Sequence, residues 1–267
     1  MNGSRTLVFG DDSSPAADIA WLFINNHQWP GWHLEIVAAH MPETAAPLPR
    51  QDTDLHAWTP PRPRKVFAEA QFAQVAELTA EADPRLVLSR KSDLLVIGPR
   101  GHGFLKALHV GSTADWLLLH PPAPLLIARH GQTVRSVVVC VDGSPDADRV
   151  TRVLAELPWA DQLAITILAV DDRRIDVDTA TGSARERLEA AGATVNVRVH
   201  GGEPTTMIHR HLADASPDLV ALGTRGLTGL RHLRLGSTAS AIARAAACSV
   251  IVACDEDEYA RTIETDR

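Results

Sequence analysis

The sequence predicts an α/β protein made of two tandem, open, parallel five-stranded sheets with helices on both faces. Short apolar runs typical of buried strands alternate with stretches of helical pattern along the chain. A glycine motif occurs twice, as GPRGHGFLKALHVGST at 98–113 and as GTRGLTGLRHLRLGST at 223–238. The length of 267 residues is ample for two domains of about 100 to 150 residues each.

The repetition extends beyond the glycines. The stretch TLVFGDDSSPA near the amino terminus matches VVVCVDGSPDA from Val137, which places Asp12 opposite Asp142 and Ser14 opposite Ser144. An internal duplication is the economical explanation. We therefore expect a first domain at 1–130 and a second at 134–255, called here the first and second halves, followed by a tail at 256–267.

The second half shows its elements clearly. Ser144 and Pro145 suit the cap and first position of a helix, and Gly192 suits a helix end. Alternation of apolar and polar residues predicts the third strand. The expected strands are 137–141, 163–170, 193–200, 218–223 and 249–253, and the later helices are 183–191, 203–215 and 237–247.

The first half follows the same plan less clearly, with strands expected at 6–10, 34–39, 93–98 and 125–129. It diverges at 41–82. The Pro-rich segment 42–63 is either a partner-binding stretch or a solvated crossover loop, and we favour the loop. Residues 65–82 form either one helix or a short helix and a strand near 75–79. We favour the strand, because Asp83-Pro84 then aligns with Glu203-Pro204.

Composition excludes several classes of protein. The formal net charge is −7 and neither half has a basic excess, which argues against a nucleic-acid-binding surface. No apolar run approaches the roughly 18 residues of a membrane span. The amino terminus enters a strand-like run without an apolar signal region, so we expect a cytoplasmic protein. Three cysteines are too few for a disulfide framework.

Each glycine motif lies between the fourth strand and the next helix. A helix amino terminus offers unpaired N–H groups and a positive dipole end, which suit phosphate. Ser237 and Thr238 would add hydroxyl donors there, and Arg225 would add a cation. Asp142 ends the first strand, where its carboxylate can accept from ribose hydroxyls or an adenine amino group. These residues predict a nucleotide site beyond the carboxyl ends of the strands.

The order strand-Asp, Gly-x-x-Gly, nine residues and Gly-Ser resembles the universal stress protein family, and the whole chain looks like a tandem member. The resemblance implies the strand order 3-2-1-4-5, ATP binding, alone or with Mg²⁺, and a pseudo-dimer formed through 125–129 and 249–253. The sites comprise Asp142, Val170, Gly223, Arg225, Gly226, Gly236, Ser237 and Thr238 in the second half. Their counterparts in the first half are Asp12, Ala39, Gly98, Arg100, Gly101, Gly111, Ser112 and Thr113.

We expect the second site to bind more tightly. Pro99 stands in the place of Thr224 and removes one backbone N–H from the phosphate loop. Asp11 adds a second carboxylate beside Asp12, and Ala39 is smaller than Val170.

Catalytic and metal-binding patterns are weak. The twelve histidines form no cluster with ligand spacing, so we expect no metal site. Asp171 and Asp172 could be an acid–base pair, but a solvated turn is the favoured interpretation. The motifs lack a Walker lysine and the chain lacks a nucleophile elbow.

The functional hypothesis is therefore a stress-response or signalling protein in which ATP occupancy is the signal and hydrolysis is slow at most. Two alternatives stay open: a nucleotide-independent scaffold with relic motifs, which could bind a protein partner, and an ATP-using enzyme of the adenine-alpha-hydrolase type.

Overall fold

The computed structural model describes residues 4–40, 67, 71–100, 111–173, 175–226 and 235–254. The Pro-rich segment 42–63, Gly101 and the tail 256–267 lie outside these ranges, so what the sequence predicts for them stays a prediction. Among the helices of the described residues, none has the length and apolar character needed to cross a membrane.

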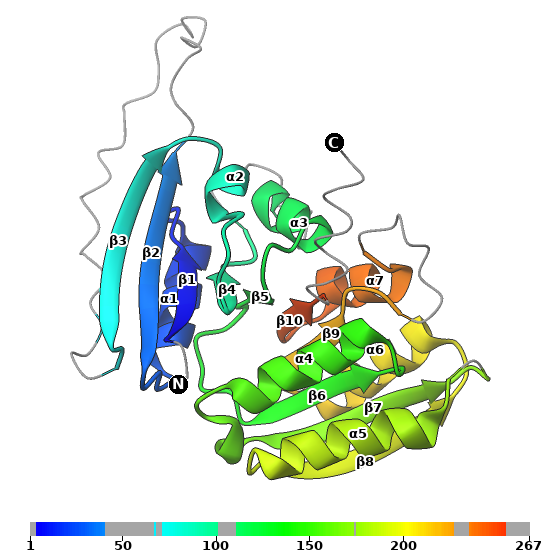
Figure 1. Ribbon diagram of the computed structural model, residues 1–267. Helices are drawn as coiled ribbons and strands as arrows, with labels where there is room; N and C mark the ends of the chain where they lie inside the picture. The colour runs from blue at the N-terminus through cyan, green and yellow to red at the C-terminus, as the bar shows by residue number, and fades with distance from the viewer. Residues whose placement is uncertain are drawn as a thin grey trace, which may run out of the picture.

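The described strands form one ten-stranded sheet in the order β3-β2-β1-β4-β5-β10-β9-β6-β7-β8. Each half has the expected internal order 3-2-1-4-5. The sequence predicted two five-stranded sheets paired through 125–129 and 249–253. In the structure β5 and β10 pair antiparallel, with Leu126 opposite Ile251, and join the halves in one ten-stranded sheet (Figure 1). The strands are β1 (Arg5–Gly10), β2 (Trp32–His40), β3 (Gln74–Glu81), β4 (Leu94–Ile97), β5 (Leu125–Ile127), β6 (Ser136–Val141), β7 (Ala164–Asp171), β8 (Thr194–Gly201), β9 (Leu219–Gly223) and β10 (Ser249–Ala253).

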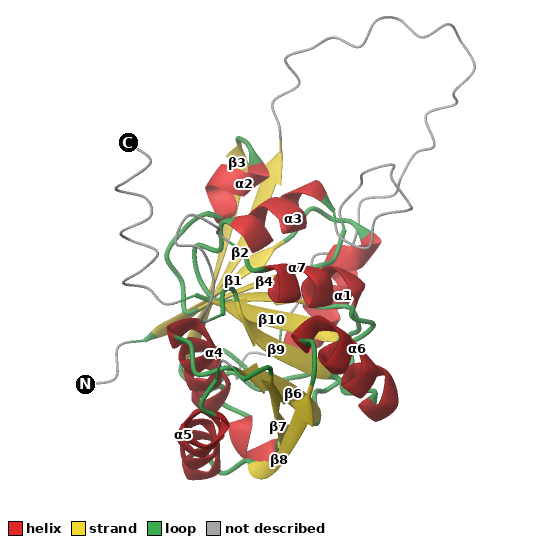
Figure 2. Cartoon of the chain, turned by 90° about the vertical axis from the view of Figure 1, so that its right-hand side faces the viewer, coloured by secondary structure: helices red, strands yellow, loops and turns green. Residues whose placement is uncertain are grey.

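Helices cover both faces of the sheet, as predicted. Alternate strand residues point to opposite faces, so Val137 and Val139 pack in one apolar cluster and Val138 packs in another. The first cluster is covered by α1 (Pro15–Asn25), α4 (Pro145–Glu156) and α5 (Val177–Ala190). The second is covered by α2 (Pro84–Leu88), α3 (Ser112–Leu119), α6 (Pro204–Ala215) and α7 (Ser237–Ala245). Figure 2 shows α4 and α5 on one side of the sheet and α6 and α7 on the other.

Residues 74–81 form a strand, which decides between the two interpretations of the divergent segment. β3 pairs in parallel with β2 from His33 opposite Gln74 to His40 opposite Glu81. The helix that follows is short: α2 has 5 residues, whereas its counterpart α6 has 12. The first half therefore keeps the strand order but presents a smaller helix beside its glycine motif.

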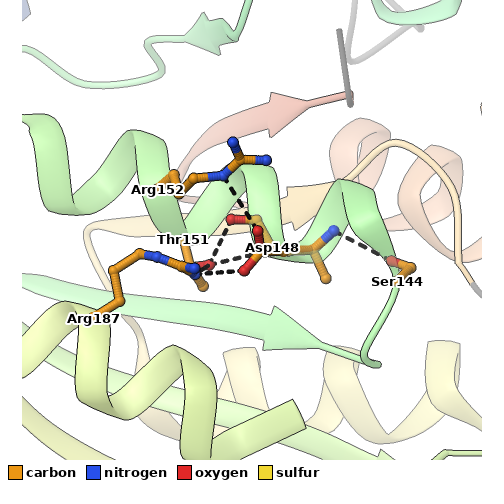
Figure 3. A network of polar contacts seen from close by, with 6 residues as sticks. Ser144, Asp148, Thr151, Arg152 and Arg187 are labelled. Atoms are coloured by element: carbon orange, nitrogen blue, oxygen red, sulfur yellow. Dashed lines mark hydrogen bonds and ion pairs between the residues drawn. The ribbon is translucent and has the colours of Figure 1, made fainter. Parts of the chain in front are cut away.

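The prediction for α5 was wrong at its start. The helix begins at Val177 instead of residue 183, and the Asp176 side chain caps it by accepting from the N–H of Thr179. Polar contacts then hold α5 against α4. The Asp148 carboxylate lies 2.6 Å from Nη1 of Arg187, which also donates to the Thr151 hydroxyl at 3.0 Å (Figure 3). This network joins α4 to α5, the helix pair that packs against β6 and β7.

Candidate functional site

A pocket of about 240 Å³ opens at the carboxyl ends of β6, β7 and β9, beside the first turn of α7. β6 and β9 are neighbours at the point where the strand order reverses, which is where open α/β sheets hold their ligands. The pocket contains all of the site residues that the sequence predicted for the second half. It is lined by Cys140, Val141, Asp142, Ala147, Leu168, Val170, Asp172, Ile175, Pro204, Ile208, Leu222, Gly223, Thr224, Arg225, Gly226, Gly236, Ser237, Thr238 and Ala239.

Asp142 is fixed by the turn between β6 and α4. Its Oδ1 atom accepts from the backbone N–H of Ser144 at 3.0 Å. The Ser144 hydroxyl caps α4 by accepting from the N–H of Ala147, and it lies 3.2 Å from the carbonyl oxygen of Arg225, to which it donates. One serine therefore ties the Asp142 turn to the glycine loop.

Two of the motif glycines lie in close contact with other groups. A Cβ atom on Gly223 would lie 2.7 Å from the backbone nitrogen of Ala147, at the start of α4. A Cβ atom on Gly226 would lie 2.6 Å from Oδ2 of Asp142. The sequence predicted both glycines as site residues, and both line the pocket. The structure adds that Gly223 allows α4 to pack closely and that Gly226 lies against the Asp142 carboxylate.

The backbone N–H of Thr224 and the side chain of Arg225 contact other protein groups, which the sequence did not lead us to expect. The N–H of Thr224 donates to the carbonyl of Ala253 at 3.0 Å, so the expectation that this N–H serves the phosphate loop directly was wrong. The Nε atom of Arg225 lies 3.2 Å from the carboxylate of Asp146, a buried residue that the sequence analysis did not select. Acidic residues are common in the first turn of a helix, so the position of Asp146 in the sequence did not indicate its contact with Arg225.

The first turn of α7 forms the polar end of the pocket. The helix cap is Gly236, which has no side chain to accept from the first N–H groups, and its own N–H donates to the carbonyl of Thr224 at 2.7 Å. The hydroxyl of Thr238 lies 3.2 Å from that of Thr205 in α6. This end therefore combines a helix amino terminus with two hydroxyl side chains, those of Ser237 and Thr238, which suits an anion.

Other residues of the pocket lining are apolar. Val170 in β7 and Ile208 in α6 are 7% and 4% exposed, and Leu222 in β9 is also buried. Burial and the nearby Asp142 carboxylate raise the pKa of the Cys140 thiol, so this side chain lines the wall as an uncharged group. A flat aromatic ring would bury its faces in such surroundings.

Sequence reasoning missed Ile175, Pro204 and Ile208 in this wall. Pro204 and Ile208 belong to α6, which follows the third strand and returns to the pocket only through the crossover of the chain. Asp172 also lines the pocket, whereas the Asp171 side chain accepts from the N–H of Arg173 in a turn. The predicted turn is therefore correct for Asp171, whereas Asp172 lies in the pocket lining.

The first half repeats the framework in part. Asp12 accepts from the N–H of Ser14 at 2.9 Å, and the N–H of Gly111 donates to the carbonyl of Pro99 at 2.8 Å. Strand register confirms that Ala39 occupies the place of Val170, since Gly10 pairs with Val37 as Cys140 pairs with Leu168. The Arg100 carbonyl accepts from the Ser14 hydroxyl, and Ser112 and Thr113 open α3.

The described residues contain no group of three or more His, Cys, Asp and Glu side chains placed to hold a metal ion. The candidate site is therefore described by its carboxylate, its helix amino terminus and its apolar wall.

Comparison with known proteins identifies relatives over both halves. The model of the universal stress protein family matches residues 33–129 and 171–253, segments that contain both glycine motifs but begin after Asp12 and Asp142. A universal stress protein of Synechocystis is 28% identical over 163 residues, which cover 60% of this chain and 57% of that relative. The chain thus matches little more than half of the length of that protein.

Two further relatives match more of the chain. A universal stress protein of Mycobacterium tuberculosis is 26% identical over 213 residues, covering 70% of this chain and 71% of its own length. The crystal structure of a universal stress protein from Archaeoglobus fulgidus superposes with a TM-score of 0.63 at 14% identity, covering 95% of this chain and 98% of that one. That structure supports the fold alone. With the family model matching both halves, the chain belongs to the universal stress protein family.

Proposed function

We propose that the pocket of the second half binds an adenine nucleotide, ATP in particular, alone or with Mg²⁺. The observation that carries this proposal is that one pocket has both a polar and an apolar part in its lining. Ser237 and Thr238 supply a helix amino terminus with hydroxyl groups, and Val170 and Ile208 supply buried apolar surface. A nucleotide has the same division between charged phosphates and a flat base.

The carboxylate of Asp142 lines the same pocket and supports ribose or adenine recognition. Its position is fixed by the N–H of Ser144 and by the close approach of Gly226. A carboxylate accepts hydrogen bonds from ribose hydroxyls and from an adenine amino group, and it repels phosphate. We therefore place the base and sugar on the β6 and β7 side and the phosphates at α7.

In this proposal nucleotide occupancy is a regulatory signal in a cytoplasmic stress response, and hydrolysis is slow at most. The domains 1–130 and 134–255 act as a pseudo-dimer, which the pairing of β5 with β10 supports. Mass spectrometry of small molecules released from the purified protein tests the nucleotide. Protein that binds no adenine nucleotide in extraction and titration would favour a nucleotide-independent scaffold, and ATP-dependent release of pyrophosphate would favour an adenine-alpha-hydrolase activity.

We also propose that the two sites are unequal and that the second binds more tightly. Ala39 offers less apolar surface than Val170, and Asp11 adds negative charge beside Asp12. Calorimetric titration of ATP into Asp142→Ala and Asp12→Ala tests the ranking. The Asp142 change is expected to remove the tighter binding event. If only the Asp12 change removes binding, the ranking is wrong.

A further inference from the structure

The carboxylate of Asp146 is buried directly behind the glycine loop. Its side chain is 2% exposed, and it belongs to the first turn of α4. The Thr224 hydroxyl donates to its Oδ2 atom at 2.6 Å. The same oxygen accepts from the backbone N–H of Arg225 at 3.0 Å and from Nε of that residue at 3.2 Å. One carboxylate oxygen thus accepts hydrogen bonds from both residues between Gly223 and Gly226.

Burying a carboxylate costs free energy unless hydrogen bonds and a countercharge replace its water. The three donors from Thr224 and Arg225 compensate Asp146 while these two residues keep their present positions. The carboxylate therefore favours one conformation of the loop. The pocket wall on this side is formed by Thr224 and Arg225 themselves, so Asp146 stands one layer behind the ligand.

The first half provides an internal comparison. Asp12 and Asp142 align, so Ala16 stands in the place of Asp146. In the glycine motifs, Pro99 stands in the place of Thr224, while Arg100 matches Arg225. Both the carboxylate and the hydroxyl that donates to it are therefore missing together from one copy, although the arginine and the glycines are present in both.

We infer that Asp146 is a positioning residue of the second-half site, a step that rests on the proposed function. By holding Thr224 and Arg225, it directs the following Gly226 and the first turn of α7 toward the phosphates. Arg225 contributes through this loop geometry, because its N–H and Nε are directed at Asp146. The inference assigns the stronger phosphate binding of the second half to a buried pair that the first half lacks.

The test compares ATP with adenosine, which keeps the base and ribose but has no phosphate. In Asp146→Ala, ATP affinity is expected to fall by about ten- to one-hundred-fold, the range for losing hydrogen bonds to a charged group. Adenosine affinity is expected to change by less than about threefold, because β6, β7 and α6 still form the apolar wall. If Asp146 had a purely structural role, its replacement would lower the affinities for ATP and adenosine by the same factor.

Asp148→Ala is the matched control, since Asp148 lies on the same helix and pairs with Arg187 of α5, and neither residue lines the pocket. It is expected to leave both affinities unchanged. Thr224→Val removes one donor and keeps the carboxylate. It is expected to lower the affinity for ATP by a smaller factor than Asp146→Ala does and to leave the affinity for adenosine nearly unchanged. This milder change keeps the inference testable if Asp146→Ala does not fold.

The reciprocal variant installs the pair in the first half as Ala16→Asp with Pro99→Thr. It is expected to tighten phosphate-dependent binding there, measured in an Asp142→Ala background that removes the second site. Equal ATP affinity in wild type and Asp146→Ala, equal loss of ATP and adenosine, or no gain in the reciprocal variant would overturn the inference. Wild type that binds neither ligand would instead overturn the proposed function, and this inference with it.

Discussion

The Nε2 atom of His27, just after α1, accepts a hydrogen bond of 3.0 Å from the backbone N–H of Val134, in the segment that leads into β6. Its Nδ1 atom lies 2.6 Å from the carbonyl of Phe23, to which it donates. The ring must therefore be neutral to keep both bonds. Its centroid lies 4.4 Å from that of Trp159, so this histidine joins the two halves on the side of the sheet covered by α1 and α4.

Protonation of His27 should weaken this junction. Burial lowers the pKa of His27 below its ordinary value of 6.5, and the nearby His130 lowers it further, while the bond to Phe23 opposes them. The unfolded chain therefore binds the proton more readily, so the full stability is present above about pH 6.5 and is lost as the pH falls through the folded pKa. Urea unfolding at several pH values from about 7.5 to 5 measures this slope.

His27→Phe is expected to be less stable at neutral pH but to show a flatter pH dependence between pH 7 and the folded pKa. If His27→Phe retained the full slope, the neutral histidine would not be its source.

Arg129 caps a helix of the opposite half. Its Nη1 atom donates to the carbonyl of Ala246 at 2.7 Å, and its Nη2 atom donates to that of Ala243 at 2.7 Å, at the end of α7. Arg129→Met should lower the free energy of unfolding by about 2 kcal/mol, because these carbonyls lose charged donors. Hydrogen exchange should then increase in β5, β10 and α7 before the outer strands.

Arg185→Met provides the control, since Arg185 pairs with Glu189 on an exposed helix surface and should contribute about 0.5 kcal/mol at most. Rapid exchange in β5 or β10 of the wild-type protein would contradict the pairing of the two halves itself.

The first glycine of each motif should matter for stability before it matters for binding. A Cβ atom on Gly98 would lie 2.4 Å from the carbonyl oxygen of Ala16. This oxygen belongs to the backbone of α1, so relieving the clash requires a backbone shift that costs free energy. Gly98→Ala and Gly223→Ala are each expected to lower the free energy of unfolding by about 1 to 3 kcal/mol. Gly182→Ala meets no atom within 4 Å inside α5 and should raise it by about 0.5 to 1 kcal/mol. Chemical denaturation of the three variants gives the comparison.

ATP turnover is expected to be far below the typical enzyme value of about 10 per second. In the orientation proposed for ATP, Asp142 faces the sugar, and the phosphates meet the N–H groups of the first turn of α7 and the hydroxyls of Ser237 and Thr238. A phosphate-release assay with purified protein measures the rate. A rate near the typical value that a single side-chain change abolished would establish an enzyme in place of a nucleotide sensor.

The sequence predicted most of the strands because short apolar runs bounded by Asp, Gly and Pro mark them. The bounds of β10 agree with the prediction at both ends. The start of α5 could not be predicted, because Asp, Thr and Gly have low helix propensity and packing of Ala180, Ala184 and Leu188 stabilises the helix instead.

The candidate site was predicted where its residues lie within the repeated motifs. Asp146 and Ile208 were missed because each reaches the pocket region through tertiary structure. Asp146 lies in the first turn of α4 and contacts a residue 78 positions later in the sequence, Thr224. Ile208 lies on α6, whose position beside α7 follows from the crossover connections of the sheet.

Calorimetric titration of ATP into Gly226→Ala, beside wild type and Gly182→Ala, tests the nucleotide site most directly. The new methyl group would lie 2.6 Å from Oδ2 of Asp142, so either the carboxylate or the loop must move. We predict that wild type and Gly182→Ala bind ATP alike at the second site and that Gly226→Ala binds it at least about tenfold more weakly. Equal affinity in all three proteins, or no binding of ATP by wild type, would contradict the assignment of this pocket as a nucleotide site.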